Sequence, residues 1–138
     1  MEKSSPYIRG RRYEYKLMSI LKKNGFFVMR SPASGRKSVR YYYPDIVAIK
    51  QGRIIIFEVK MIGDKRALYL PRRQYRKLEW IRRVTGAECY ISVYYKDKGK
   101  FLFVDLNSYE RKSNRYYIWS RRYITEKGKT LSEVVGEC

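Results

Sequence analysis

Two carboxylates on either side of a short turn are the residues of this sequence whose type and spacing could do chemistry. Asp45 and Glu58 are separated by 12 residues, and Gln51-Gly52 at the centre is a typical two-residue hairpin turn. That turn predicts a register in which Asp45 lies directly opposite Glu58. Opposed side chains in an antiparallel pair hold their Cβ atoms about 4.5–5.5 Å apart, where two carboxylates repel unless a cation joins them. The spacing therefore predicts a site for a hard divalent cation such as Mg²⁺.

Lys60 and Glu14 extend this candidate site. Lys60 follows Glu58 by two positions, so strand alternation directs both side chains to the same face. An ammonium group beside a metal can orient a water molecule or stabilise charge on a phosphate, as metal-assisted phosphodiester hydrolysis requires. Glu14 shares a helical stripe with Leu17 and Leu21, and a carboxylate there needs a partner. We expect it to be a third metal ligand.

Plainer interpretations exist for each of these carboxylates. An Asp–Glu pair across a hairpin is often a solvated surface pair. Glu14 could simply be a first-turn residue near the positive end of a helix dipole.

The charge of the chain indicates its partner. Its 138 residues include 32 Lys and Arg against 13 Asp and Glu, a net charge of +19. Such an imbalance is typical of proteins that bind polyanions. The sequence has no histidine, which excludes Ser–His catalysis and His-ligated metals, and its two cysteines are too few for a disulfide framework or a zinc site. No apolar run reaches about 18 residues, and no secretory signal is visible, so we expect an intracellular nucleic-acid protein without a membrane span.

The pattern of apolar residues and turns predicts the element order α-β-β-β-α-β-β. The expected helices cover residues 9–23 and 71–85, and the expected strands cover residues 26–30, 43–49, 53–60, 89–95 and 101–106. A Ser, Pro and Gly-containing loop fills residues 31–40, and Thr130 to Glu133 fit a capping box that opens a short final helix. We expect a single α/β domain, residues 1–138, in which a mixed β-sheet is flanked by helices.

The residues around the candidate site resemble a known nuclease family. Pro44-Asp45, followed by Glu58-Val59-Lys60, resembles the signature of the PD-(D/E)xK nuclease superfamily. A wider set is similar to the archaeal Holliday-junction resolvases across residues 8–106, leaving 107–138 as a C-terminal extension: Glu14, Asn24-Gly25-Phe26, Arg30-Ser31-Pro32-Ala33-Ser34-Gly35, Pro44-Asp45-Ile46-Val47-Ala48, Phe57-Glu58-Val59-Lys60 and Gln74.

This resemblance implies a function and an assembly. It implies a homodimer of restriction-endonuclease-like fold that uses Mg²⁺, with Mn²⁺ as a substitute. Such a dimer cuts four-way DNA junctions by paired nicks in recombination and repair. A C₂ dimer would match the two-fold symmetry of a junction.

The resemblance also implies roles for individual residues. Glu14, Asp45 and Glu58 would be the metal ligands, and Lys60 the active-site lysine. Two further residues would have catalytic roles: Arg30 would contact phosphate near the scissile bond, and Ser34 would match the functional serine of the family. The basic charge of the loop and of the second helix, apart from the resemblance, adds further phosphate contacts. The full set of expected DNA contacts is Arg11, Arg12, Arg30, Ser34, Arg36, Lys37, Arg72, Arg73, Gln74 and Arg76. Many members carry Arg where this chain has Tyr15, so Arg11 or Arg12 would replace that phosphate contact.

Two other functions compete with junction resolution. One keeps the nuclease site but changes the substrate to duplex or flap DNA, as in restriction or repair enzymes. The other is a non-catalytic, basic nucleic-acid-binding protein. Carboxylates gathered opposite a polyanion disfavour the second alternative, because a pure binder gains nothing from them.

Overall fold

The computed structural model describes residues 6–31, 43–63 and 66–136. Its elements in chain order are α1 (Pro6–Lys23), β1 (Phe27–Arg30), β2 (Ile46–Lys50), β3 (Arg53–Ile62), β4 (Leu68–Pro71), α2 (Arg72–Thr85), β5 (Glu88–Tyr95), β6 (Lys100–Asp105), β7 (Arg111–Lys112), β8 (Tyr116–Trp119), α3 (Arg121–Lys127) and α4 (Leu131–Val135). Among the described residues, no helix combines the length and apolar character needed to cross a membrane.

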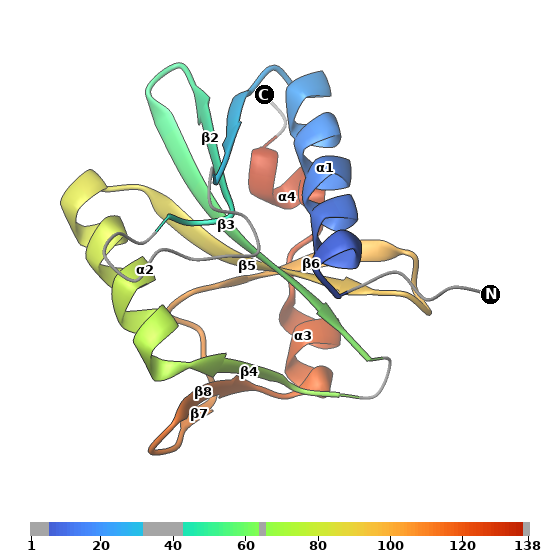
Figure 1. Ribbon diagram of the computed structural model, residues 1–138, viewed down its shortest axis with the longest axis vertical. Helices are drawn as coiled ribbons and strands as arrows, with labels where there is room; N and C mark the ends of the chain where they lie inside the picture. The colour runs from blue at the N-terminus through green and yellow to red at the C-terminus, as the bar shows by residue number, and fades with distance from the viewer. Residues whose placement is uncertain (1–5, 32–42, 64–65, 137–138) are drawn as a thin grey trace.

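A five-stranded mixed sheet forms the centre of the molecule (Figure 1). Its strand order is β1-β2-β3-β5-β6, and β3 and β5 are the parallel pair. The β2–β3 hairpin has the predicted register, with Ile46 opposite Phe57. Gln51 and Gly52 have φ values of 48° and 80°, as a two-residue turn with two left-handed positions requires. The local turn therefore sets which residues of the two strands meet.

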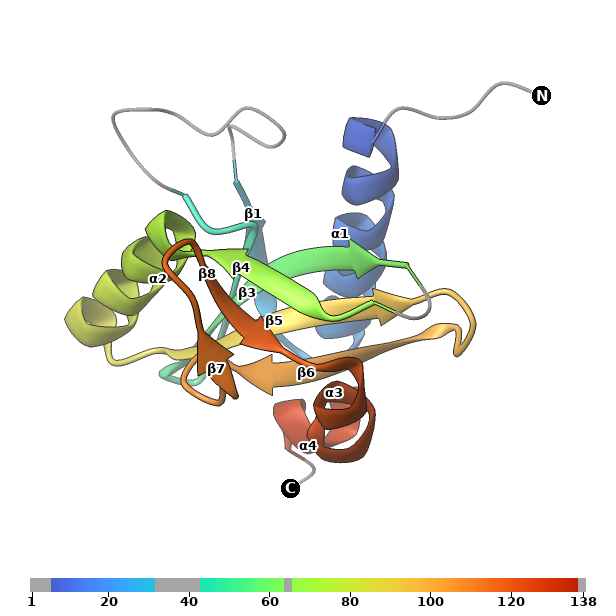
Figure 2. The same cartoon turned by 90° about the horizontal axis from the view of Figure 1, so that it is seen from below.

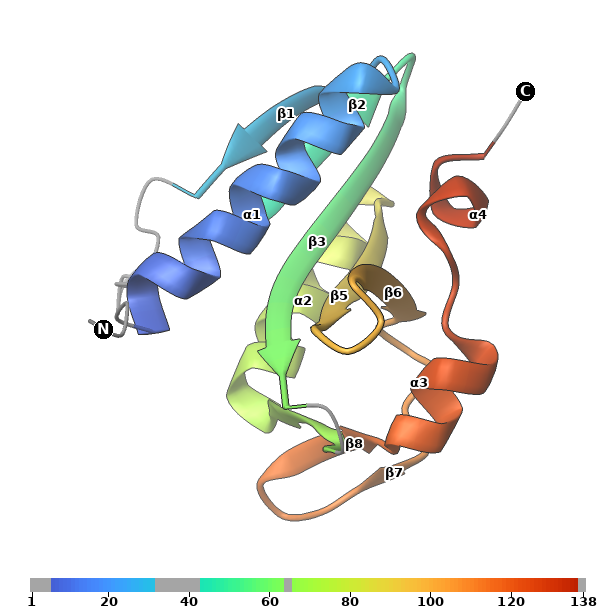
Figure 3. The ribbon, with the colours of Figure 1, turned by 90° about the vertical axis from the view of Figure 1, so that its right-hand side faces the viewer.

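Helices α1 and α2 lie on opposite faces of this sheet (Figure 3). Leu17 and Leu21 of α1 are fully buried against one face, together with Phe57 of β3. Tyr75 and Leu78 of α2 pack on the other face with residues from β3 and β5. The sheet is thus covered on both sides, as its continuous apolar runs predict.

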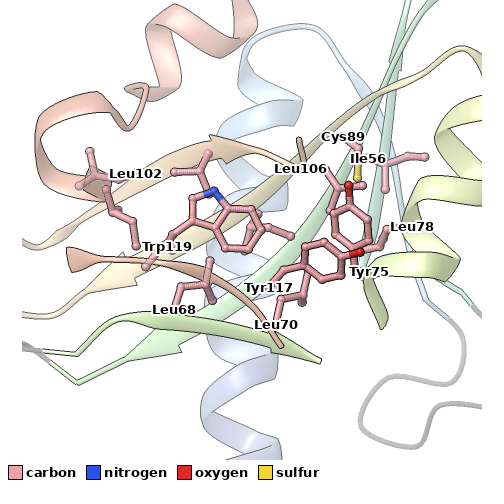
Figure 4. Close-up of a cluster of buried hydrophobic side chains, with 14 of the residues drawn as sticks. Ile56, Leu68, Leu70, Tyr75, Leu78, Cys89, Leu102, Leu106, Tyr117 and Trp119 are labelled. Carbon is pink, nitrogen blue, oxygen red and sulfur yellow. The ribbon is translucent and has the colours of Figure 1, made fainter. Parts of the chain in front are cut away.

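A second sheet of three short strands, in the order β4-β8-β7, lies beside α2 (Figure 2). It joins β4, which precedes α2, to β8 in the C-terminal extension, and it closes one of the cores with Trp119 and Tyr117 (Figure 4). None of the strands of this second sheet was predicted from the sequence. Strands of two to four residues are too short to show a period, and their partners lie far away along the chain.

Several element boundaries differ from the expected ones. Helix α1 begins at Pro6, three residues earlier than expected, and Pro71 ends β4 and serves as the N-cap of α2. Gly86 ends α2 in the left-handed conformation, as predicted. The side chain of Trp80 on this helix is 59% exposed although it is large and apolar. The exposed Trp80 faces away from the core because Tyr75 and Leu78 set the buried stripe.

The C-terminal extension packs onto β6. Lys129 exchanges two backbone hydrogen bonds with Phe103, at 2.8 and 2.9 Å. Helix α4 then begins with the predicted capping box, in which the side chains of Thr130 and Glu133 each accept a backbone hydrogen bond from the other residue. Val134 of this helix is fully buried in the same cluster as Leu17.

Candidate active site

Asp45 and Glu58 meet where β2 begins. Strand β2 starts at Ile46, and Pro44 has no N–H with which to extend a ladder. At this point a side chain continues the contact between the two strands: Asp45 Oδ2 accepts a hydrogen bond of 2.9 Å from the backbone N–H of Val59. Asp45 is 9% exposed and Glu58 only 1%. The register of β2 and β3, continued by one residue beyond the pair of Ile46 and Phe57, places Asp45 across from Glu58.

Gln74 connects Glu58 to Lys60. From the first turn of α2, its Nε2 donates a hydrogen bond of 3.0 Å to Glu58 Oε1. Its Oε1 accepts one of 3.1 Å from Lys60 Nζ. The expected shared face of Glu58 and Lys60 is confirmed by this bridge, since one amide reaches both side chains. Gln74 was expected as a DNA contact, and its hydrogen bonds to Glu58 and Lys60 were not predicted.

Glu14 forms an ion pair with Arg30. The Arg30 Nε lies 3.4 Å from Glu14 Oε1, and Glu14 is 7% exposed. The Arg30 guanidinium also lies over the ring of Tyr15, 4.9 Å from its centre. Arg30 pairs with Ile46 at the end of β1, so this ion pair adjoins the Asp45 side of the site. Tyr15 thus supports Arg30 by a cation–π contact.

The three carboxylates expected to hold one metal ion do not form a single cluster. Among the described residues, no three Asp, Glu or Cys side chains come close enough together to hold one metal ion. The expectation that Glu14, Asp45 and Glu58 share an ion is therefore not met here. The Arg30 guanidinium places a positive charge beside Glu14, whereas Asp45 accepts its hydrogen bond from the backbone of Val59, the residue after Glu58. A pair of oxygen donors suits Mg²⁺ or Mn²⁺, which keep several water ligands.

The expected DNA-contacting residues divide into three groups. Arg12, Arg73 and Arg76 are exposed, while Arg11, Arg30, Arg72 and Gln74 are half-buried. Arg72 places its guanidinium 5.6 Å from the ring centre of Tyr117. Ser34, Arg36 and Lys37 lie outside the described residues.

Neither a buried thiol nor a buried phenol provides a nucleophile near this site. Burial raises the pKa of the Cys89 thiol well above its ordinary value, so the thiolate is not formed at neutral pH. Burial also raises the pKa of Tyr75 to about 12, with a smaller contribution from Glu79. Neither Cys89 nor Tyr75 is thus ionised at neutral pH.

The sequence of this chain is similar to those of known proteins. Residues 5–138 match the family described as archaeal Holliday junction resolvase (Hjc). The crossover junction endodeoxyribonuclease Hjc of Sulfurisphaera tokodaii is 33% identical over 98 residues, which are 71% of this chain and 67% of that protein. A crossover junction endodeoxyribonuclease of Sulfolobus islandicus rod-shaped virus 1 is 37% identical over 90 residues, covering 63% of this chain and 72% of that one.

A solved structure is similar across nearly the whole fold. Hjc of Archaeoglobus fulgidus, a Holliday junction resolvase, superposes with a TM-score of 0.80 at 26% sequence identity. The match covers 94% of this chain and 98% of that one. The similarity therefore includes the C-terminal extension.

Proposed function

Since this chain belongs to the archaeal Holliday junction resolvase family, we propose that it is an endonuclease that cuts four-way DNA junctions by divalent-metal-dependent hydrolysis. The observation that carries the proposal is the Gln74 bridge, which joins Glu58 and Lys60 beside Asp45. Buried carboxylates are unexpected in a chain of net charge +19 that only binds DNA. They are expected where a divalent cation must be held against a phosphate.

The proposed chemistry assigns a role to each group. Asp45 and Glu58 would hold Mg²⁺, with Mn²⁺ as a substitute. The bound ion supplies a Lewis acid and lowers the pKa of a water. Hydrolysis forms a P–O bond from water and breaks the bond between phosphorus and the leaving 3′ or 5′ oxygen, which takes up a proton. Lys60 would donate a hydrogen bond to a phosphate oxygen as negative charge develops there.

Arg30 and Glu14 would act on the phosphate from the end of β1, which pairs with Ile46 beside Asp45. Arg30 would contact a phosphate oxygen near the scissile bond. Glu14 would orient the guanidinium through the ion pair between them, with Tyr15 beneath the same group. A positioned guanidinium binds phosphate bidentately, which gives the strand a defined direction across the site. In this arrangement Glu14 is a positioning residue rather than a metal ligand.

Cleavage of three DNA substrates tests the proposal. A four-way junction, a flap and a linear duplex of the same arm sequences should be compared in Mg²⁺ with one protein preparation. We expect nicking of the junction at a rate well above that of the other two, and loss of nicking in Asp45→Ala. Equal cleavage of the duplex or flap would favour a restriction- or repair-type nuclease. Unimpaired cleavage by Asp45→Ala would refute the assigned site.

We also propose that the protein acts as a homodimer through the α2 side of the sheet. Trp80 and Val84, one turn apart on α2, are 59% and 63% exposed. Phe27 and Met29 of β1 are 62% and 46% exposed, and their partners Ile49 and Val47 place them on the same side of the sheet as α2. Exposed apolar side chains of this size mark protein interfaces. A two-fold dimer would present two active sites to a two-fold junction.

The oligomeric state can be measured directly. Sedimentation of the wild-type protein should give a dimer, and Trp80→Glu should shift it to a monomer. A monomer at micromolar wild-type concentration would contradict the dimer proposal without affecting the site.

A further inference from the structure

We propose that the pocket between the end of β3 and strand β4 binds one nucleotide of the cleaved strand, with its base stacked on Tyr69. This inference rests on the proposed function, because it names a part of the substrate that lies beside Lys60. Asp45 and Glu58 are not among the residues that line this pocket.

The pocket has the size and charge for a nucleotide. It encloses about 500 Å³ and is lined by Lys60, Met61, Ile62, Gly63, Arg66, Ala67, Leu68 and Tyr69. Sites for small organic ligands typically measure about 300–1,000 Å³. Among the described residues, its lining includes two cationic side chains, Lys60 and Arg66, and no acidic one. One wall is therefore suited to a phosphate group.

Arg66 is held at this pocket by its surroundings. Its backbone C=O accepts a hydrogen bond of 3.3 Å from the Tyr95 hydroxyl, which lies in the core. Its side chain passes over Gly63, where an added Cβ would lie 3.4 Å from Arg66 Cδ. Arg66 has no ion-pair partner among the residues that the structure describes. A cation with an anchored backbone and no such partner fits a phosphate of the strand.

Tyr69 presents an aromatic ring at the same pocket. It is 50% exposed, although its neighbours Leu68 and Leu70 are buried, because alternation along β4 turns it outward. The ring of Tyr116 on β8 meets it edge to face, with centres 5.6 Å apart and planes at 82°. This contact restricts the orientation of the Tyr69 ring. Bases stack on such rings with little regard to sequence, since every base has a π-face.

The position of the pocket relates it to cleavage. Lys60 belongs both to its lining and to the Gln74 bridge. A nucleotide bound there would thus neighbour the scissile phosphate. In a continuous duplex, a base must leave its stack before it can reach an aromatic ring, and unstacking is costly. At the branch point of a junction, helical stacking is already interrupted. The pocket would therefore favour branched DNA over continuous duplex.

The test compares two substitutions of one residue on two DNA molecules. Dissociation constants of Tyr69→Leu and Tyr69→Phe should be measured for a four-way junction and for a duplex of the same arm sequence, in Ca²⁺ to suppress cleavage. We expect Tyr69→Leu to weaken junction binding by about 5- to 150-fold, which corresponds to roughly 1–3 kcal/mol of stacking, and to leave duplex binding unchanged. Tyr69→Phe should match the wild type. Equal weakening on both substrates, or none, would overturn the proposal.

A second variant decides the question if Tyr69→Leu does not fold, as judged by its thermal unfolding. Arg66→Gln removes the cation of the pocket, and Arg122→Gln removes the same charge from α3, where its side chain is 85% exposed. We expect Arg66→Gln to weaken junction binding more than Arg122→Gln does. Equal effects of these two variants would contradict the nucleotide pocket. A wild-type protein that cuts duplex as fast as junction would instead contradict the proposed function.

Discussion

Replacing Gln74 by Leu tests whether the bridge between Glu58 and Lys60 supports cleavage. Leucine keeps the helical propensity and similar bulk at this position of α2, but removes both side-chain hydrogen bonds. A hydrogen bond to a charged group contributes about 1.5–3 kcal/mol. If the whole free energy of the hydrogen bond to Lys60 stabilises the transition state, its loss slows cleavage by about 10- to 150-fold. The loss of the donor to the nearly buried Glu58 should also lower the melting temperature by a few degrees.

The assay should separate chemistry from binding. Single-turnover nicking of a four-way junction at saturating protein reports the cleavage step, and a gel-shift titration reports affinity. We expect the nicking rate to fall, the Mg²⁺ concentration for half-maximal rate to rise, and junction affinity to stay within about threefold, because other cations dominate binding. Gln74→Glu isolates one half of the bridge, since it can still contact Lys60 but places a like charge beside Glu58. A Gln74→Leu rate within about threefold of wild type would refute the positioning role.

Three further substitutions test the charges and the tail. Asp45→Asn keeps an oxygen for the Val59 N–H but removes a charge beside Glu58; nicking should fall at least about 100-fold in a gel assay, while the melting temperature stays equal or rises. Hydrogen bonding from Arg53 holds the pKa of Glu88 below its ordinary value, so this contact stabilises the fold above the unfolded-state pKa and is lost as pH falls through the folded one. Glu88→Gln should therefore show a flatter decline of melting temperature in acid, and an unchanged slope would argue against this pair. Thr130→Ala removes the N-cap of α4 and should lower the free energy of unfolding by about 0.5–2 kcal/mol in a urea titration; an unaltered midpoint would contradict the cap.

The carboxylate pair could be predicted because a local feature determines it. The turn at Gln51-Gly52 sets the register of the two strands that follow and precede it, and that register brings Asp45 to Glu58. The predicted direction of Lys60 follows from strand alternation alone. Neither inference needs any knowledge of how distant elements pack.

Contacts between distant elements could not be predicted in the same way. The sequence predicts which face of its helix Glu14 occupies. Its ion pair with Arg30 depends on how α1 packs across β1, which the sequence pattern does not give. The Gln74 bridge likewise depends on where α2 begins relative to β3, and β4 places that point through its pairing with β8. The aromatic run of β8 and the alternation of Leu68, Tyr69 and Leu70 were the available signals for the second sheet. Strands this short fall below the length at which periodicity is informative.

The backbone hydrogen bonds between Phe103 and Lys129 protect the sheet against aggregation. Strand β6 is an outer strand of the five-stranded sheet, and an uncovered outer strand invites addition of a strand from another molecule. Lys129 occupies part of that edge, and α3 and α4 flank it. A chain truncated before residue 121 would keep Asp45, Glu58, Lys60 and Gln74 yet expose this edge. Such a truncated protein should fail first by aggregation, while its catalytic groups are still in place.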